Sequence, residues 1–289
     1  MHHELILIAG GGLALLVAAS VLSSRTGIAP PLLLLGFGLG VSLLPGVPEV
    51  EVSPEVILAG VLPPLLYASA VRMPINDVRR NFGLILWLSV VLVVVSALVV
   101  GVVVHWLFPQ IPLPLGIALG AVLGPTDAVA ATAIGKRLGL PPRLLTVLEG
   151  ESLFNDATAL VGLRTALAAG AVGAFSIGGA LGDFVWAVLV GVGVGFGVGW
   201  LSVLVRGRLG DPVLTSTISL AVPFFAYFPA ESLHASGVLA VVVAGLVAGS
   251  RATRQLTAHD RQSESTNWAT VNFVLESAVF LAMGLELTA

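Results

Sequence analysis

Long apolar runs separated by short polar segments make up most of the chain. A helix needs about 20 mainly apolar residues to cross a bilayer core about 30 Å thick. Ten runs approach this length: Leu5–Leu22, Ile28–Leu44, Val56–Val71, Phe82–Val104, Leu113–Ile134, Val147–Ala169, Leu181–Val205, Leu214–Phe228, Leu233–Gly249 and Thr270–Leu287. They are continuous, unlike the alternating ten-residue strands of a membrane β-barrel. The pattern predicts an all-α, polytopic helical membrane protein with about ten transmembrane helices.

Composition supports this class and excludes others. Of the 289 residues, 57% are hydrophobic and 10% are charged, against about 25% charged in soluble domains. The net charge of −3 offers no basic surface for a phosphate backbone, so we expect a lipid bilayer as partner and no nucleic acid. Because the chain has no cysteine, disulfides and thiolate metal sites are excluded. We expect no cofactor.

The basic residues test the order of the spans, because positive charge favours cytoplasmic loops. Twelve of the 13 basic residues follow odd-numbered spans. This alternation predicts a multi-pass protein of the plasma membrane with both termini outside. The thirteenth, Arg164, lies inside the sixth span, where an ion pair or a snorkelling role is favoured over a direct one. The twelve are Arg25, Arg72, Arg79, Arg80, Lys136, Arg137, Arg143, Arg206, Arg208, Arg251, Arg254 and Arg261.

A Gly-Pro pair interrupts the fifth span near its middle. Pro125 has no amide hydrogen and disfavours helix at Gly124, whereas Thr126 and Asp127 are suited to cap a new half-helix. Broken helices at membrane depth occur where they line protein or water, and their inward-pointing ends attract ions. A proline kink with polar caps is the simpler alternative, but an aspartate at the break favours a binding site.

The sixth span adds a second group of polar residues. At about 100° per residue, Ser152 and Asp156 share one helix face and Glu151 and Asn155 share the adjacent one. Ionisable groups inside a span indicate function, and carboxylate, amide and hydroxyl oxygens suit hard cations such as Na⁺, Li⁺ or K⁺. The alternative is a satisfied hydrogen-bond cluster between helices.

These two segments resemble the monovalent cation/proton antiporter family 1, the sodium/proton exchangers. The stretch Gly124–Ala130 is similar to the broken helix of that family, and Glu149–Asp156 is similar to its signature helix. Weaker similarity runs through Leu62–Tyr67, Ser236–Gly245 and Asn272–Leu287, so that it covers nearly the whole chain. The resemblance implies an antiporter fold, exchange of a monovalent cation for H⁺, and a homodimer.

The resemblance also implies roles for individual residues. Asp156 matches the carboxylate that binds Na⁺ and H⁺ in competition, with Ser152 and Thr126 as oxygen ligands. Asn155 matches the asparagine that accompanies electroneutral exchange. Glu151 matches a buried, auxiliary glutamate, and Asp127 matches an aspartate that is structural or balances the helix ends.

Chain length is the main departure from the family, which usually has about three further spans with a second broken helix. We therefore expect residues 1–289 to form one transporter domain that lacks the C-terminal spans and holds an incomplete inverted repeat. A non-transporting remnant is then one alternative. An intramembrane enzyme using buried carboxylates is another, although the Gly-x-Gly-Asp loop and the His-Glu-x-x-His helix are absent from the sequence. A passive channel is the third alternative. Channels line their pores with rings of charge or carbonyls, whereas one buried site on a broken helix suits alternating access.

The mechanism expected from these residues is alternating access. Burial in a membrane raises the pKa of a carboxyl group, and a nearby bound cation lowers it again. A proton and a cation then exclude each other. A carboxylate that is exposed to each side in turn, and rarely moves empty, exchanges one for the other.

Overall fold

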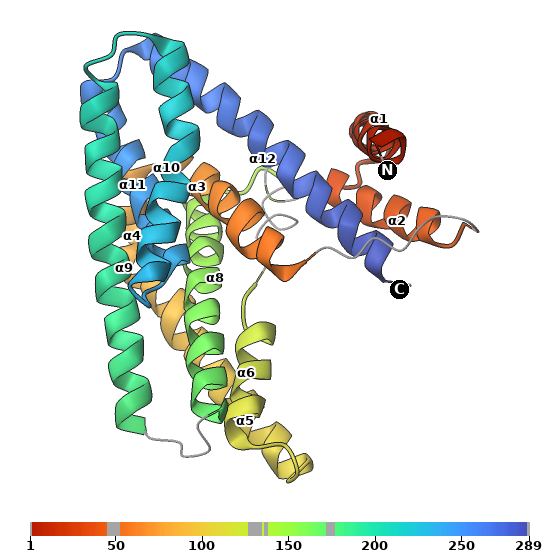
Figure 1. Ribbon diagram of the computed structural model, residues 1–289, viewed down its shortest axis with the longest axis vertical. Coiled ribbons are helices and arrows are strands. Elements are labelled where there is room, and N and C mark those ends of the chain that lie inside the picture. The colour runs from red at the N-terminus through yellow and green to blue at the C-terminus, as the bar shows by residue number, and fades with distance from the viewer. Residues whose placement is uncertain (1, 45–52, 127–134, 136–137, 172–176, 288–289) are drawn as a thin grey trace. The chain divides into compact units, whose positions relative to one another are not determined.

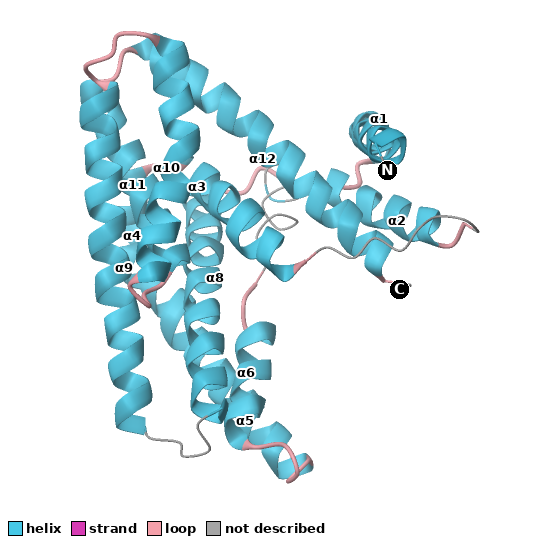
Figure 2. Ribbon diagram, viewed as in Figure 1, coloured by secondary structure: helices cyan, strands magenta, loops and turns pink. Residues whose placement is uncertain are grey.

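Helices make up all the regular structure in the described part of the chain, residues 2–44, 53–126, 135, 138–171 and 177–287 (Figures 1 and 2). The all-α class predicted from the apolar runs is confirmed. In order, the helices are α1 (His2–Thr26), α2 (Pro30–Ser42), the π-helix η1 (Val56–Val61), α3 (Leu62–Arg72), α4 (Ile75–Leu86), the π-helix η2 (Trp87–Leu92), α5 (Val93–Leu107), α6 (Leu113–Leu123), α8 (Pro142–Ala171), α9 (Ile177–Arg206), α10 (Pro212–Ser232), α11 (Gly237–Gln255) and α12 (Ala258–Glu286).

Each predicted span overlaps one helix or a run of successive helices. Within the described residues, five helical segments are long and apolar enough to cross a membrane, and shorter apolar helices cover Pro30–Ser42, Val56–Arg72 and Leu113–Leu123. The exact number of ten spans stays a prediction. The five long segments are Asn76–Leu107, Leu181–Arg206, Pro212–Ser232, Gly237–Gln255 and Ala258–Glu286.

The boundary predicted between the eighth and ninth spans is wrong. Helix α10 continues to Ser232, and its C-terminal turn is closed by a 2.9 Å bond from the Ala235 amide to the Ala230 carbonyl. His234 takes a left-handed conformation in this turn, with φ of 54°. The next helix starts at Gly237, where the Ser236 hydroxyl caps it by accepting from the Leu239 amide at 3.1 Å.

The predicted start of the tenth span is wrong by twelve residues, because α12 begins at Ala258 and not at Thr270. Two reciprocal bonds cap this helix: the Thr257 amide donates to the Asp260 carboxylate at 3.1 Å, and the Asp260 amide donates to the Thr257 hydroxyl at 3.2 Å. The first turns are polar, so hydropathy alone does not detect them.

The contacts divide the chain into two compact units. The first unit holds residues 1–65 and 266–289, and the second holds residues 66–265. In the first unit, α2 packs closely on the last turns of α12. A Cβ atom on Gly38 would lie 3.0 Å from the Cα of Gly284, and one on Gly284 would meet the Leu35 carbonyl oxygen. Glycine at both positions allows this approach.

The second unit contains two sets of closely packed helices. One set, here the α8 bundle, consists of α4, η2, α5, α6 and α8; the other, here the α9–α11 bundle, consists of α9, α10 and α11. Gly191, Gly195 and Gly199 lie where α9 meets α11, because a Cβ atom on each would meet a backbone carbonyl oxygen of Ser236, Ala240 or Ala244. Glycine at these three positions allows the two helices to approach closely.

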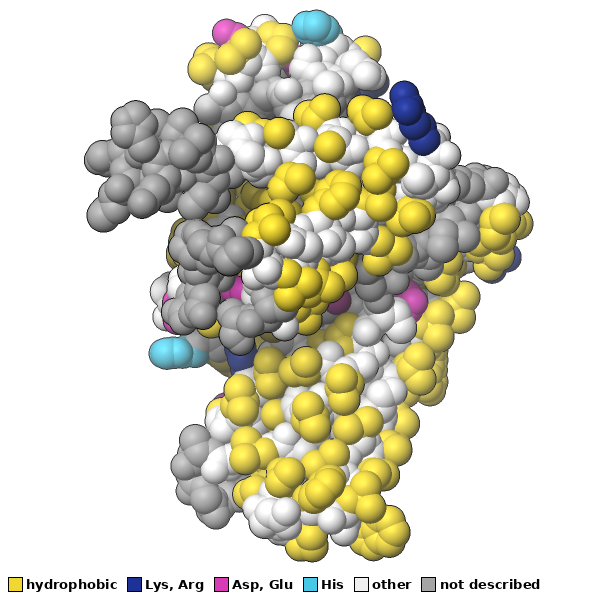
Figure 3. Space-filling view, turned by 90° about the vertical axis from the view of Figure 1, so that its right-hand side faces the viewer, with side chains coloured by type: hydrophobic (Ala, Val, Ile, Leu, Met, Phe, Trp, Pro, Cys, Tyr) yellow, Lys and Arg dark blue, Asp and Glu magenta, His cyan; other side chains and the backbone are white. Residues whose placement is uncertain are grey.

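The surface of the described helices suits lipid. Large apolar side chains are exposed along α5 and α9, among them Leu98, Val102, Leu189 and Phe196. Figure 3 shows one face on which hydrophobic side chains greatly outnumber charged ones. Such a surface is unfavourable in water and favourable in a bilayer, as expected for a multi-pass membrane protein.

Candidate functional site

The helix of the fifth span stops where the sequence predicts it. Helix α6 ends at Leu123, and residues 124–126 are not helical. Pro125 explains the stop, because it lacks the amide hydrogen and restricts the preceding residue. The segment after the break, including Asp127, lies outside the described residues. The structure therefore confirms the first half of the predicted broken helix.

Side chains of α8 bind the unwound segment. The Thr126 hydroxyl donates to a Glu151 carboxylate oxygen at 2.6 Å. The Asn155 side-chain amide lies 3.1 Å from the Thr126 hydroxyl, 3.4 Å from the Thr126 carbonyl and 3.3 Å from the same Glu151 oxygen. The Thr126 carbonyl thus has a side-chain donor, and backbone groups at membrane depth require such partners. The structure brings these three predicted site residues together.

The two faces predicted for α8 are distinct in the structure. Asn155 is fully buried and Glu151 nearly so, whereas Ser152 and Asp156 are half-buried on the adjacent face. Ser152 and Asp156 each have a polar or electrostatic interaction. The Oδ1 atom of Asn155 is buried without a hydrogen-bond partner. Buried polar atoms are usually paired, so such an atom needs an explanation, and a ligand or a water molecule would supply one.

The residues around the break offer oxygen ligands. Thr126 has a hydroxyl and a carbonyl, Glu151 and Asp156 have carboxylates, and Ser152 has a hydroxyl. This ligand type suits a hard monovalent cation. Among the described residues there is no cluster of three or more His, Cys, Asp or Glu side chains that could hold a metal ion.

An ion pair joins Arg164 of α8 to the last turn of α10. Its Nη1 atom lies 2.6 and 2.7 Å from the two carboxylate oxygens of Glu231. Of the two readings of Arg164 in the sequence, the ion pair is confirmed. The partner was not predicted, since Glu231 is 67 residues away in the chain.

A second ion pair was missed entirely by the sequence analysis. Arg206, at the end of α9, is fully buried and binds Glu264 of α12 through its Nη1 at 2.7 Å and its Nη2 at 3.3 Å. The Ser219 hydroxyl of α10 donates to the same carboxylate at 2.5 Å. Arg206 was assigned to a cytoplasmic loop by charge, and Glu264 lay outside the predicted span. A helical pattern starting at Ala258 would have placed Glu264 inside the helix.

Comparisons with known proteins identify the family of the chain. A family model described as "Sodium/hydrogen exchanger, transmembrane" matches residues 12–289. The chain is 34% identical over 283 residues to a "Sodium, potassium, lithium and rubidium/H(+) antiporter" of Bacillus pumilus, covering 95% of this chain and 42% of that protein. It is 33% identical over 260 residues to the "Na(+)/H(+) antiporter ApNhaP" of Aphanothece halophytica, covering 88% and 49%.

A solved structure shows the same fold. The sodium proton antiporter MjNhaP1 from Methanocaldococcus jannaschii at pH 8 aligns with a TM-score of 0.74 at 21% identity, covering 98% of this chain and 71% of that one. At this identity the likeness establishes the fold alone. The chain spans less than half the length of the two curated relatives described above.

Proposed function

Because the chain belongs to the sodium/hydrogen exchanger family, we propose that it takes part in secondary active antiport, exchanging a monovalent cation for H⁺ by alternating access. The family consists of transporters, so the chain is not an enzyme and the intramembrane-enzyme alternative is wrong. One observation carries the proposal: Glu151 and Asn155 both bind Thr126 in the unwound segment. Asn155 directly precedes Asp156 in the chain.

In this proposal Asp156 binds the cation and the proton in competition, with Ser152 and Thr126 as further oxygen ligands. Glu151 and Asn155 position Thr126, since both contact its hydroxyl. Asp127 balances the helix ends at the break. Only one carboxyl group then changes partner in each cycle, so one monovalent cation leaves for each proton and the exchange is electroneutral.

Na⁺ is the proposed cation, with Li⁺ and K⁺ as further substrates. The names of relatives from Bacillus pumilus and Bacillus subtilis include sodium, potassium and lithium, and an all-oxygen site accommodates each of these ions. We further propose that residues 1–289 belong to one transporter domain, because the family match runs through both compact units. The proposed location is the plasma membrane, with both termini outside, and the proposed assembly is a homodimer.

Proton flux in proteoliposomes with an imposed Na⁺, Li⁺ or K⁺ gradient tests the function. The chain should produce cation-driven flux, and Asp156→Asn should abolish it while the helical circular dichroism spectrum stays unchanged. Asp77→Asn, in the first turn of α4, is the matched control and should retain exchange. Full exchange in Asp156→Asn, or no cation-driven flux in the parent, would contradict the proposal.

A further inference from the structure

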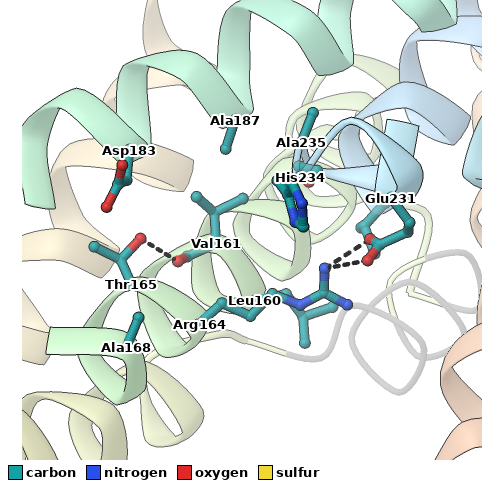
Figure 4. Close-up of a pocket in the computed structure, with 12 residues that line it drawn as sticks. Leu160, Val161, Arg164, Thr165, Ala168, Asp183, Ala187, Glu231, His234 and Ala235 are labelled. Carbon is teal, nitrogen blue, oxygen red and sulfur yellow. Dashed lines mark hydrogen bonds and ion pairs between the residues drawn. The ribbon is translucent and has the colours of Figure 1, made fainter. Parts of the chain in front are cut away.

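A pocket lies between the α8 bundle and the α9–α11 bundle. It has a volume of about 320 Å³ and is lined by Leu160, Arg164 and Thr165 of α8, Asp183 of α9, Glu231 at the end of α10, and His234 of the turn before α11 (Figure 4). These α8 residues follow Asp156 toward the helix end that the charge pattern places outside. Arg164 is eight residues past Asp156, about 12 Å along the helix. The pocket thus lies toward the outer side of the proposed ion site.

The turn on one side of the pocket is fixed to α9. The Ser236 amide donates to the Ala187 carbonyl at 3.2 Å, and the Trp186 indole donates to the Leu233 carbonyl at 3.1 Å. Glu231 is held by the same turn, because one of its oxygens accepts from the Gly237 amide at 3.1 Å. Glu231 is therefore a fixed acceptor on the α9–α11 bundle.

The helix on the other side of the pocket is held differently. Helix α8 packs most extensively on α6, and it also contacts α4, α9 and α11. Arg164 extends from α8 across the pocket edge to Glu231, as Figure 4 shows, and it also interacts with Tyr227 of α10. The ion pair therefore links the helix that holds Asp156 to the neighbouring bundle.

Exposure separates this ion pair from the buried one in the same unit. The side chains of Arg164 and Glu231 are 44% and 26% exposed, whereas those of Arg206 and Glu264 are 0% and 6% exposed. Exposed pairs contribute little net stability, and breaking a buried pair is strongly destabilising. The Arg164–Glu231 pair is therefore suited to opening and closing repeatedly, and the Arg206–Glu264 pair is suited to holding helices together permanently.

We propose that the Arg164–Glu231 pair is a latch that closes the outer side of the cation pathway, and that the pocket between the bundles is the outer mouth of this pathway. The inference rests on the proposed antiport. With the latch closed, as in this structure, Asp156 is shielded from the outer side. When Arg164 releases Glu231, α8 separates from the turn, and a monovalent cation reaches Asp156 from outside past the carboxylates of Glu231 and Asp183.

Thiol labelling tests the latch, because the chain has no native cysteine. Leu160→Cys places a thiol in the pocket one helical turn from Asp156, and Ala168→Cys places one in the exposed part of the pocket lining. The probe is a membrane-impermeant, positively charged methanethiosulfonate reagent added from outside. Adding Arg164→Gln or Glu231→Gln should speed labelling of Leu160→Cys by about tenfold or more. The reason is that the open state, which is populated to about a few per cent with the ion pair intact, becomes the common state without it. Labelling of Ala168→Cys should change little.

The charge-swapped variant Arg164→Glu/Glu231→Arg is the control for folding and for charge, and it should restore slow labelling of Leu160→Cys. Unchanged labelling in both neutralised variants, or labelling of the pocket only from the opposite face, would overturn the latch. The labelling needs no transport, so the two proposals fail separately. Normal latch behaviour in a chain without exchange would contradict the antiport, and exchange that depends on Asp156 with unchanged labelling would contradict the latch.

Discussion

Replacing Arg206 by methionine should destabilise the second unit more than any change at an exposed ion pair. The substitution leaves the Glu264 carboxylate 6% exposed, with the Ser219 hydroxyl still donating to it. Breaking a buried pair by removing one partner typically costs about 3–5 kcal/mol, because the remaining charge is uncompensated. Total stabilities of domains are about 5–15 kcal/mol, so a large part of the free energy of unfolding should be lost.

Chemical denaturation in detergent micelles, followed by tryptophan fluorescence, measures this loss. The double variant Arg206→Met/Glu264→Leu removes both charges and should recover most of the stability, since apolar replacements of buried pairs are often neutral or stabilising. Arg164→Gln is the matched control at the exposed pair and should cost at most about 1 kcal/mol. A loss below about 1 kcal/mol in Arg206→Met, or a double variant as unstable as the single one, would refute this reasoning.

Three further changes test the packing and the site. Gly195→Ala should destabilise the chain by about 1–3 kcal/mol in the same chemical denaturation, because the added Cβ meets the Ala240 carbonyl oxygen. Gly193→Ala is the control. Its added Cβ meets nothing within 4 Å, so it should be neutral or stabilise the chain by up to about 1 kcal/mol. Ser236→Ala removes the cap of α11 and should cost about 1 kcal/mol, and an unchanged midpoint would contradict this. Thr126→Val removes the donor to Glu151 and should lower cation-driven flux more than Thr217→Val, which changes an exposed hydroxyl of α10; equal flux would argue against Thr126 as a site residue.

Much of the fold follows from apolar patterning and from local rules. The Gly124-Pro125 pair ends α6 where predicted, because the missing amide is a local property that tertiary contacts do not repair. The glycine face of α9 was also predictable, since a three-glycine stripe leaves room for a neighbouring backbone. The start of α12 was not predicted, because hydropathy averages over many residues and misses its capped, polar first turns. The start of α11 was predicted four residues too early, because Leu233 and Ala235 extend the apolar run.

The candidate site was predictable in part. The shared face of Glu151 and Asn155 follows from helical spacing, and both contact Thr126. The ion pairs could not be derived in the same way. Arg206 and Glu264 are 58 residues apart, and each looks like a loop or surface residue in its own segment. Only the packing of α9 against α10 and the start of α12 reveals that both are buried.

Proton release on cation binding tests the central claim most directly, that one cation and one proton compete for Asp156. Purified protein in a weakly buffered solution is mixed with NaCl or with choline chloride at equal ionic strength, and the change in pH is recorded. The account predicts that Na⁺ releases protons from the parent, that choline does not, and that Asp156→Asn releases none while Asp77→Asn behaves as the parent. Equal release from Asp156→Asn, or no release from the folded parent, would contradict it.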